Sequence, residues 1–166
     1  MSSDNLPKDH PKILNKTGVL VINLGTPEGY GYFAVRKYLK EFLSDKRVIE
    51  VNPILWKLIL NCFILPLRPF ATGKKYESIW MKDVDESPLK YYTKSQAKKL
   101  QGLVGDDSGL IVDYAMRYGK PSIESKINEL LQQGCQKIIF IPLYPQYCSA
   151  TTATISDEIY RVLKKV

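Results

Sequence analysis

A hydroxyl-rich segment follows a short apolar run near the carboxyl end of the chain. Residues 137–141 are typical of a buried strand, and residues 142–154 carry Tyr144, Tyr147 and several serines and threonines. In an open parallel sheet the ligand crevice lies beyond the carboxyl ends of the strands. The two phenols would then offer hydroxyl donors and aromatic faces to a ligand. The alternative is that both tyrosines pack the edge of the core while two prolines stiffen a turn.

Two other apolar runs are followed by residues that could meet a ligand. Gly25 follows the run 19–24 and allows the backbone to lie close to a ligand. The segment lacks the Gly-x-Gly-x-x-Gly spacing and a phosphate-loop lysine, which disfavours a dinucleotide site. Arg117 follows the run 109–114, where a guanidinium would pair with a ligand carboxylate. A structural ion pair with Asp113 or with another carboxylate is the alternative.

Length and composition indicate one compact globular domain. The 166 residues are 45% hydrophobic, and 24 Lys and Arg against 17 Asp and Glu give a net charge of +7. This charge would suit a polyanionic ligand, an acidic membrane surface or nucleic acid, without choosing among them. The cysteines Cys62, Cys135 and Cys148 are widely spaced, so we expect reduced thiols and no zinc site. Residues 1–15 carry no secretory signal, and we expect residues 1–17 to form a mobile tail.

Helical patterns alternate with the three apolar runs, as in a doubly wound α/β fold around a parallel sheet. We expect helices at residues 30–43, 91–103, 121–133 and 152–166. Residues 46–51 could supply a fourth strand. The residues expected on the inner faces of these helices are Phe33, Leu39, Phe42, Leu43, Leu100, Leu103, Ile123, Ile127, Leu130, Leu131, Ile155, Ile159, Val162 and Leu163.

The longest apolar stretch is residues 54–67. Lys57 and Asn61 interrupt it and Pro66 limits it, so it falls short of the roughly 20 residues that a membrane-spanning helix needs. It nevertheless carries more apolar surface than one helix face on a core would use. The stretch is therefore expected either to be deeply buried or to touch a bilayer.

Five motifs occur in the order seen in ferrochelatases. They are Gly18–Pro27, Tyr38–Asp45, Ser87–Leu89, Ala115–Gly119 and Pro142–Tyr147. From about residue 18 to residue 166, the chain resembles the amino-terminal half of a bacterial ferrochelatase. The resemblance implies a chelatase-like fold of two similar doubly wound halves, with residues 18–166 as one half and the second half absent. It also implies insertion of Fe(II) into protoporphyrin IX, the last step of haem biosynthesis.

The resemblance further implies which residues contact the porphyrin. By motif position they are Leu24, Arg68, Tyr76, Ser87, Arg117, Tyr144 and Tyr147. A flat, mostly apolar macrocycle suits a leucine and aromatic faces, whereas its propionates need donors such as Arg68, Tyr76 and Ser87. The residue types alone leave plainer alternatives open, namely a solvated arginine, a packing tyrosine, a turn-forming serine and a core leucine.

The resemblance also favours the bilayer for residues 54–67. This region forms the apolar lip of ferrochelatases, through which a membrane-soluble porphyrin enters. The lip residues expected here are Trp56, Leu60, Phe63 and Ile64. Together with the +7 charge, this predicts a cytoplasmic protein that associates peripherally with the inner membrane and does not bind nucleic acid.

No catalytic or metal-ligating residue is expected within this chain. The family's metal-handling histidine and glutamate belong to the second half and are expected beyond Val166, and the sole histidine, His10, falls in the expected tail. We therefore expect the chain to be inactive without a carboxyl-terminal half, and Fe(II) to be a substrate of the complete enzyme. No permanently bound cofactor is expected. Where some members place a [2Fe-2S] ligand cysteine, this chain has Ser149, with Cys148 one position earlier.

Two other functions compete with the enzyme half. One is a free-standing porphyrin- or haem-binding module that uses the same pocket without chemistry. The other is a single-domain chelatase of the cobalt or sirohydrochlorin kind. Such enzymes carry histidines in the domain itself, whereas this sequence has no histidine beyond residue 15, which disfavours the second alternative.

Overall fold

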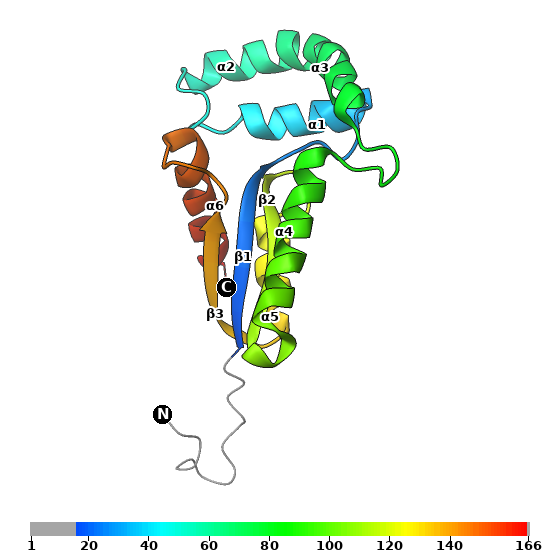
Figure 1. The fold of residues 1–166 in the computed structure, drawn as a ribbon. Coiled ribbons are helices and arrows are strands. Elements are labelled where there is room, and N and C mark those ends of the chain that lie inside the picture. The colour runs from blue at the N-terminus through cyan, green and yellow to red at the C-terminus, as the bar shows by residue number, and fades with distance from the viewer. Residues whose placement is uncertain (1–15, 166) are drawn as a thin grey trace.

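A three-stranded parallel sheet forms the centre of the computed structural model, which describes residues 16–165. The strands lie in the order β2–β1–β3, with β1 at Lys16–Gly25, β2 at Leu110–Tyr118 and β3 at Cys135–Pro142 (Figure 1). Each of the three apolar runs forms one strand, as predicted. β1 is central, and its residues 19–22 are buried because both faces of the strand are covered.

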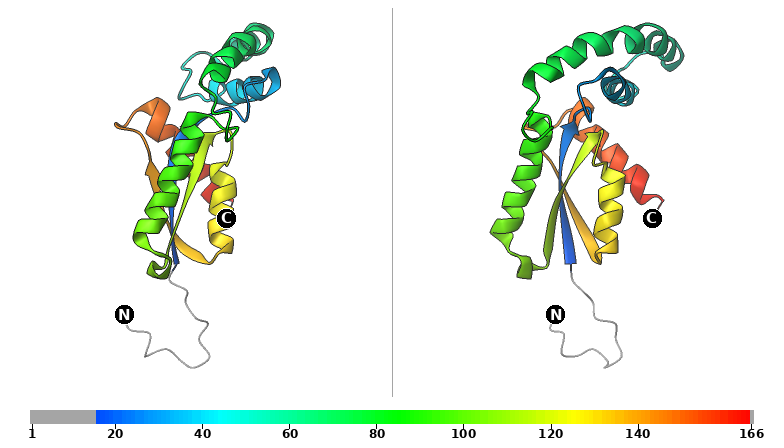
Figure 2. Two further views of the ribbon diagram at one scale, coloured as in Figure 1. Left: turned by 45° about the vertical axis from the view of Figure 1, so that its right-hand side comes forward. Right: turned by 90° about the vertical axis from the view of Figure 1, so that its right-hand side faces the viewer.

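Helices cover both faces of this sheet, which confirms the doubly wound α/β class. α4 (Pro88–Val104) lies on one face, and α5 (Ile123–Gln132) and α6 (Thr154–Leu163) lie on the other (Figure 2). A short 3₁₀ turn at Asp106–Ser108 precedes β2, and a π-helical turn at Ser149–Ala153 leads into α6. The core on the α5 and α6 face contains Leu20, Ile22, Ala115, Ile123, Ile127, Leu130, Cys135, Ile155, Ile159 and Val162.

The last helix is shorter than the sequence pattern predicts. We expected a helix over residues 152–166, whereas α6 ends at Leu163. Val166, the last residue of that expected helix, lies outside the described residues.

A second group of helices lies beyond the carboxyl ends of the strands (Figure 1). It consists of α1 (Tyr32–Leu43), α2 (Pro53–Ile59), a π-helical turn (Leu60–Ile64) and α3 (Leu65–Ile79). α1 packs against α3. A second core cluster joins these helices to the end of β2, and its buried members are Val35, Tyr38, Leu39, Leu43, Leu60, Leu65 and Tyr118.

Side-chain caps set where three of the helices begin. Ser122 Oγ accepts a hydrogen bond from the backbone N–H of Ser125 at the start of α5 (3.1 Å). Ser87 Oγ does the same for Lys90 at the start of α4 (3.3 Å), and Asn52 Oδ1 accepts from residue 54 at the start of α2 (3.0 Å). Each cap supplies an acceptor to an N–H that has no partner within the helix. The Ser87 cap starts α4 three residues before the expected residue 91.

Residues 46–51 form no strand, so the expected fourth strand is wrong. The backbone N–H groups of Val48 and Ile49 both donate to the carbonyl of Asp45 (3.1 Å each), and the Asp45 carboxylate accepts from the N–H of Arg47 (2.8 Å). These bonds close a turn directly after α1. At the other end of the domain, β1 begins at Lys16, so residues 16 and 17 belong to the sheet and not to the tail.

Three of the residues expected on inner helix faces are exposed instead. Phe33 is 82% exposed, Leu103 84% and Leu163 44%, so these three assignments are wrong. α1 buries Val35, Tyr38 and Leu39, and α4 buries Thr93 and Ala97, as their buried residues show. Phe33 and Leu103 lie outside these buried faces, whereas Leu39 and Leu43, which were also expected there, are buried.

Residues Pro53–Ile79 form one helical stretch of 27 residues. Judged by length and composition only, it is long and apolar enough to cross a membrane. Of the 18 consecutive residues that are most apolar, 17% are buried. Only one side of the stretch packs on α1, so the stretch as a whole is not deeply buried. Of the expected lip residues, Leu60 is buried (3% exposed) and Trp56 and Ile64 pack partly against the core, whereas Phe63 is 63% exposed. The outer side, here called the apolar helix face, consists of Ile54, Leu55, Leu58, Phe63, Leu67 and Phe70.

Candidate ligand-binding site

A pocket of about 520 Å³ lies at the carboxyl end of β1, between the end of α3 and the start of α4. We call it the hydroxyl pocket. It brings together Leu24, Tyr76 and Ser87, three of the seven residues predicted to contact a porphyrin. Its size is in the range of small-molecule sites. Its full lining is Asn23, Leu24, Gly25, Thr26, Tyr38, Tyr76, Ile79, Ser87, Pro88, Leu89, Tyr92, Thr93 and Gln96, a set without a charged side chain.

Two tyrosines from different helices form one wall of this pocket. Tyr38 of α1 and Tyr76 of α3 meet edge to face, with their ring centroids 6.3 Å apart, and the Tyr38 hydroxyl donates to the carbonyl of Gly25 (3.3 Å). Burial raises the pKa of both phenols above the usual value, because a buried site disfavours the charged phenolate. Both groups therefore stay neutral at physiological pH. The Tyr38 O–H is already donated to Gly25, whereas the Tyr76 O–H can be donated to a ligand.

The opposite wall is held by hydrogen bonds between β1 and α4. Asn23 Nδ2 donates to Thr93 Oγ1 (3.1 Å), and Thr93 Oγ1 donates in turn to the carbonyl of Leu89 (2.7 Å). Ser87 is 1% exposed, and its Oγ accepts the capping bond from Lys90. The turn-forming role of Ser87 is thus observed. Because accepting a bond uses only a lone pair, its O–H remains able to donate to a ligand.

Thr26 contributes a buried hydroxyl that makes no hydrogen bond of ordinary geometry, although it lies close enough to the Tyr76 phenol to lower the pKa of that group. The residue is 3% exposed and lines the hydroxyl pocket, and its Oγ1 makes no hydrogen bond within residues 16–165. Buried polar groups are normally paired, and leaving one unpaired costs about 1–3 kcal/mol. The hydroxyl is therefore available to a molecule bound in the pocket.

Replacing Thr26 with valine is expected to raise the free energy of unfolding by about 1 kcal/mol, because it removes an unpaired hydroxyl at little change in volume. Urea titration followed by circular dichroism measures this change. Thr93→Val is the matched control and should lower the free energy of unfolding by about 1–2 kcal/mol, since Asn23 and Thr93 lose bonds that they make. If Thr26→Val unfolded at lower urea than the parent chain, the Thr26 hydroxyl would have a partner in solution.

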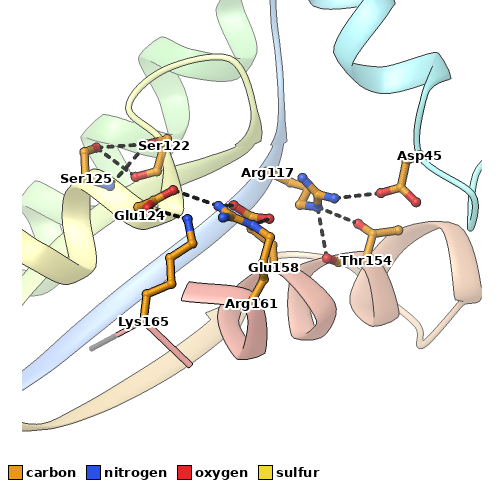
Figure 3. Close-up of polar contacts among 9 residues, drawn as sticks. All are labelled: Asp45, Arg117, Ser122, Glu124, Ser125, Thr154, Glu158, Arg161 and Lys165. Atoms are coloured by element: carbon orange, nitrogen blue, oxygen red, sulfur yellow. Dashed lines mark hydrogen bonds and ion pairs between the residues drawn. The ribbon is translucent and has the colours of Figure 1, made fainter. Parts of the chain in front are cut away.

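Arg117 does not line the hydroxyl pocket, because its place in β2 directs it to the other face of the sheet. Ala115 packs in the core beneath α5 and α6, and residues two apart in a strand point to the same face. Arg117 Nη2 pairs with Asp45 Oδ2 (2.7 Å), and Nε donates to the carbonyl and the hydroxyl oxygen of Thr154 (2.9 and 3.2 Å; Figure 3). The structural ion pair is therefore present, with Asp45. Asp113 pairs instead with Lys126 (2.9 Å).

The Arg117–Asp45 pair is well shielded from water. The two side chains are 13% and 12% exposed, and Asp45 Oδ2 also accepts a hydrogen bond from the Tyr118 hydroxyl (2.9 Å). The Arg117 guanidinium lies 4.4 Å from the centre of the Tyr118 ring. Through Arg117, β2 is thus joined both to the turn after α1 and to the start of α6, segments far apart in the sequence.

The remaining predicted residues are separate from the pocket. Tyr144 is half-buried against the core of the α5 and α6 face, and its hydroxyl is a second buried group without a partner among residues 16–165. Burial raises the pKa of Tyr144 to about 12. Tyr147 is 76% exposed. Arg68 is exposed on α3 and forms no ion pair with the part of the chain that the structure describes.

Sequence reasoning assigned no role to three residues: Thr26 and Tyr38, which line the hydroxyl pocket, and Asp45, which pairs with Arg117. Tyr38 could have been found, because Val35, Tyr38, Leu39 and Phe42 repeat with the spacing of one helix face. Asp45 was part of a quoted motif, but its partner is 72 residues away in the sequence. Nothing in the local pattern distinguishes Thr26 from an ordinary turn residue.

Residues 16–165 contain no group of three or more His, Cys, Asp or Glu side chains that could hold a metal ion. The thiols are free, with Cys135 buried and Cys62 and Cys148 exposed. His10 lies outside the described residues, and so does Val166, beyond which we expect the family's histidine and glutamate.

Comparison with known proteins gives one consistent result. The family model described as Ferrochelatase matches residues 16–166. A ferrochelatase of Allorhizobium ampelinum is 49% identical over 164 residues, which are 98% of this chain and 48% of that relative. A ferrochelatase of Francisella tularensis subsp. tularensis is 54% identical over 152 residues, covering 92% of this chain and 45% of the relative. The chain spans about half the length of these curated relatives, and it belongs to the ferrochelatase family.

Proposed function

We propose that this chain is the porphyrin-binding half of a ferrochelatase, and that the complete enzyme inserts Fe(II) into protoporphyrin IX. The observation that carries the proposal is the hydroxyl pocket. It combines an apolar floor from Leu24 with neutral donors from Tyr76 and Ser87, and these are residues to which the family resemblance assigns porphyrin contacts. A largely apolar macrocycle that carries carboxylates fits a site of this composition.

We further propose that the metal chemistry needs groups that this half does not supply. Taking up Fe(II) ordinarily recruits imidazole or carboxylate ligands, and residues 16–165 gather no such cluster. Under this proposal the family's histidine and glutamate lie beyond Val166 and the chain is inactive alone. Fe(II) and protoporphyrin IX are then substrates of the complete protein, and no cofactor is permanently bound.

Membrane contact is the third part of the proposal. The apolar helix face exposes large side chains such as Ile54 (84%), Leu58 (60%) and Phe63 (63%) on one continuous helical stretch. Exposed apolar patches of this kind mark interaction surfaces. We propose peripheral attachment to the cytoplasmic side of the inner membrane, because the opposite side of the stretch packs on α1 and is not available to lipid.

A porphyrin titration tests the binding proposal. Protoporphyrin IX is added to the chain and the change in its absorbance and fluorescence is followed, and we expect saturable binding. Tyr76→Phe and Ser87→Ala should each weaken binding about ten-fold, the effect of losing one hydrogen bond to a charged group. Tyr160→Phe, a change at a tyrosine that is 66% exposed on α6, is the matched control and should bind as the parent chain does.

Metal insertion is measured on the same samples, with Zn(II) by fluorescence and Fe(II) by absorbance. No insertion above the spontaneous rate is expected. Sustained insertion well above that rate would contradict the placement of the metal chemistry outside this chain. Absence of porphyrin binding by the parent chain would contradict the pocket assignment itself.

A further inference from the structure

A second pocket, of about 320 Å³, lies where the end of α1, the following turn and α2 meet. Three lysines line it, Lys40, Lys46 and Lys57, and we call it the lysine pocket. Each lysine is exposed, and none lies within 4.0 Å of a carboxylate among residues 16–165. Three lysines thus border one hollow, and no carboxylate among the described residues pairs with their ammonium groups.

The acidic residue in the lining does not offset these charges. Asp45 contributes to the wall, but its Oδ2 is bound by the Arg117 guanidinium (2.7 Å) and the Tyr118 hydroxyl (2.9 Å). The negative charge of Asp45 is therefore neutralised by the Arg117 guanidinium and does not offset the lysines. The pocket keeps a positive potential, which favours an anionic ligand.

The remaining walls of the lysine pocket are apolar. Ile49, Val51 and Trp56 contribute them, and the indole of Trp56 is held in place because its Nε1–H donates to the carbonyl of Leu43 (2.7 Å). A hydrated inorganic anion gains little from such walls, whereas a molecule with both a phosphate and an apolar part uses both kinds of surface.

The lysine pocket also continues into the apolar helix face. An adjoining surface groove shares Pro53, Lys57 and Asn61 with it and is lined further along by Ile54 and Leu58. An acyl chain that leaves the pocket would therefore lie directly on exposed apolar side chains. Positive charge beside an inserted apolar surface is the arrangement that anionic bilayers attract.

We propose that the lysine pocket binds the phosphate-bearing headgroup of an anionic phospholipid, with the acyl chains of that lipid lying along Ile54 and Leu58. The site would set the orientation of the apolar helix face on the membrane and select anionic over neutral bilayers. This inference rests on the membrane contact proposed above. It is independent of porphyrin binding.

Vesicle co-sedimentation tests this proposal. The chain is mixed with vesicles of phosphatidylcholine alone, or of phosphatidylcholine with phosphatidylglycerol, and stronger binding to the anionic vesicles is expected. Lys40→Gln/Lys46→Gln/Lys57→Gln should weaken binding to the anionic vesicles by about five-fold for each lysine, or about 100-fold in total, and leave binding to neutral vesicles unchanged. Ile54→Ser/Leu58→Ser should weaken binding to both kinds.

The control has the same change in net charge at a distance from the pocket. Lys98→Gln/Lys99→Gln/Lys137→Gln alters exposed lysines of α4 and β3 and should keep the preference for anionic vesicles. Equal losses in the two triple variants would overturn the headgroup site but leave membrane contact standing. Absence of binding to any vesicle would overturn both. Saturable binding of inorganic phosphate alone, measured by calorimetry, would overturn the choice of a lipid.

Discussion

Replacing Asp45 with alanine is expected to lower the free energy of unfolding by about 3–5 kcal/mol, the usual cost of removing one partner from a buried ion pair. The variant leaves the Arg117 guanidinium, 13% exposed, without its carboxylate, and it leaves the Tyr118 hydroxyl without its acceptor. The desolvation cost of both groups remains while the attraction is lost. Urea unfolding at neutral pH, followed by circular dichroism, measures the change.

Two variants make this expectation specific. Glu28→Ala removes the carboxylate of an exposed pair, with side chains 43% and 69% exposed, and should change the free energy of unfolding by less than about 1 kcal/mol. Asp45→Leu/Arg117→Met removes both charges of the buried pair and should cost less than Asp45→Ala alone. A loss below about 1 kcal/mol in Asp45→Ala would mean that water reaches the pair.

The same interaction holds the turn that borders the lysine pocket. Asp45 lies in the turn between α1 and α2, beside Lys46 of the lysine pocket, and its partner Arg117 is anchored to Thr154 at the start of α6 (Figure 3). A second ion pair, between Arg47 and Asp157, fixes the same turn to α6. The position of the turn before α2 thus depends on contacts from β2 and α6.

The sheet was predictable because buried parallel strands carry a local signal. Residues 19–24, 109–114 and 137–141 are nearly continuous apolar runs, and each became part of a strand that the helices cover. β2 extends to Tyr118, past the expected end, because its last residues keep pairing with β1 up to Gly25. A local pattern does not report such pairing, since the partner residues lie far apart in the sequence.

Helix faces were predicted less well, for a reason that α1 shows clearly. Phe33 was expected on the inner face, yet the face that packs on the core is set by the positions Val35, Tyr38 and Leu39. Phe33 falls outside that face and is 82% exposed, in contact with the ring of Tyr32. Position on the helix, and not the hydrophobicity of one residue, decides which side chain is buried.

Within the candidate site, the residues that entered the hydroxyl pocket are those next to a strand end or a helix end. Leu24 lies at the end of β1 and Ser87 caps α4, so sequence motifs located both. Arg117 also lies near a strand end, but strand alternation turns it to the opposite face. A motif therefore locates a residue along the chain, whereas the face on which it lies depends on the register of the strand.

Replacing Gly25 with alanine is expected to cost roughly 3–5 kcal/mol of unfolding free energy and to prevent porphyrin binding, because a side chain has no space there. Gly25 has a φ of +105°, and a Cβ at this residue would lie 1.8 Å from the carbonyl oxygen of Tyr118. Either β1 or β2 would have to move at its carboxyl end. The Gly25 carbonyl also accepts the hydroxyl of Tyr38, so the same movement would displace a wall of the hydroxyl pocket.

Gly31→Ala separates this effect from the general cost of losing a glycine. Gly31 has a φ of −66°, and a Cβ there would meet no atom within 4 Å. The free energy of unfolding of Gly31→Ala should therefore stay within about 0.5 kcal/mol of that of the parent chain. Urea unfolding and protoporphyrin titration are measured on both variants. If Gly25→Ala unfolded at the parent's urea concentration, β1 and β2 would not approach each other this closely in solution. If it stayed folded and bound porphyrin normally, the ligand would not depend on the end of β1, and the hydroxyl pocket would not be its site.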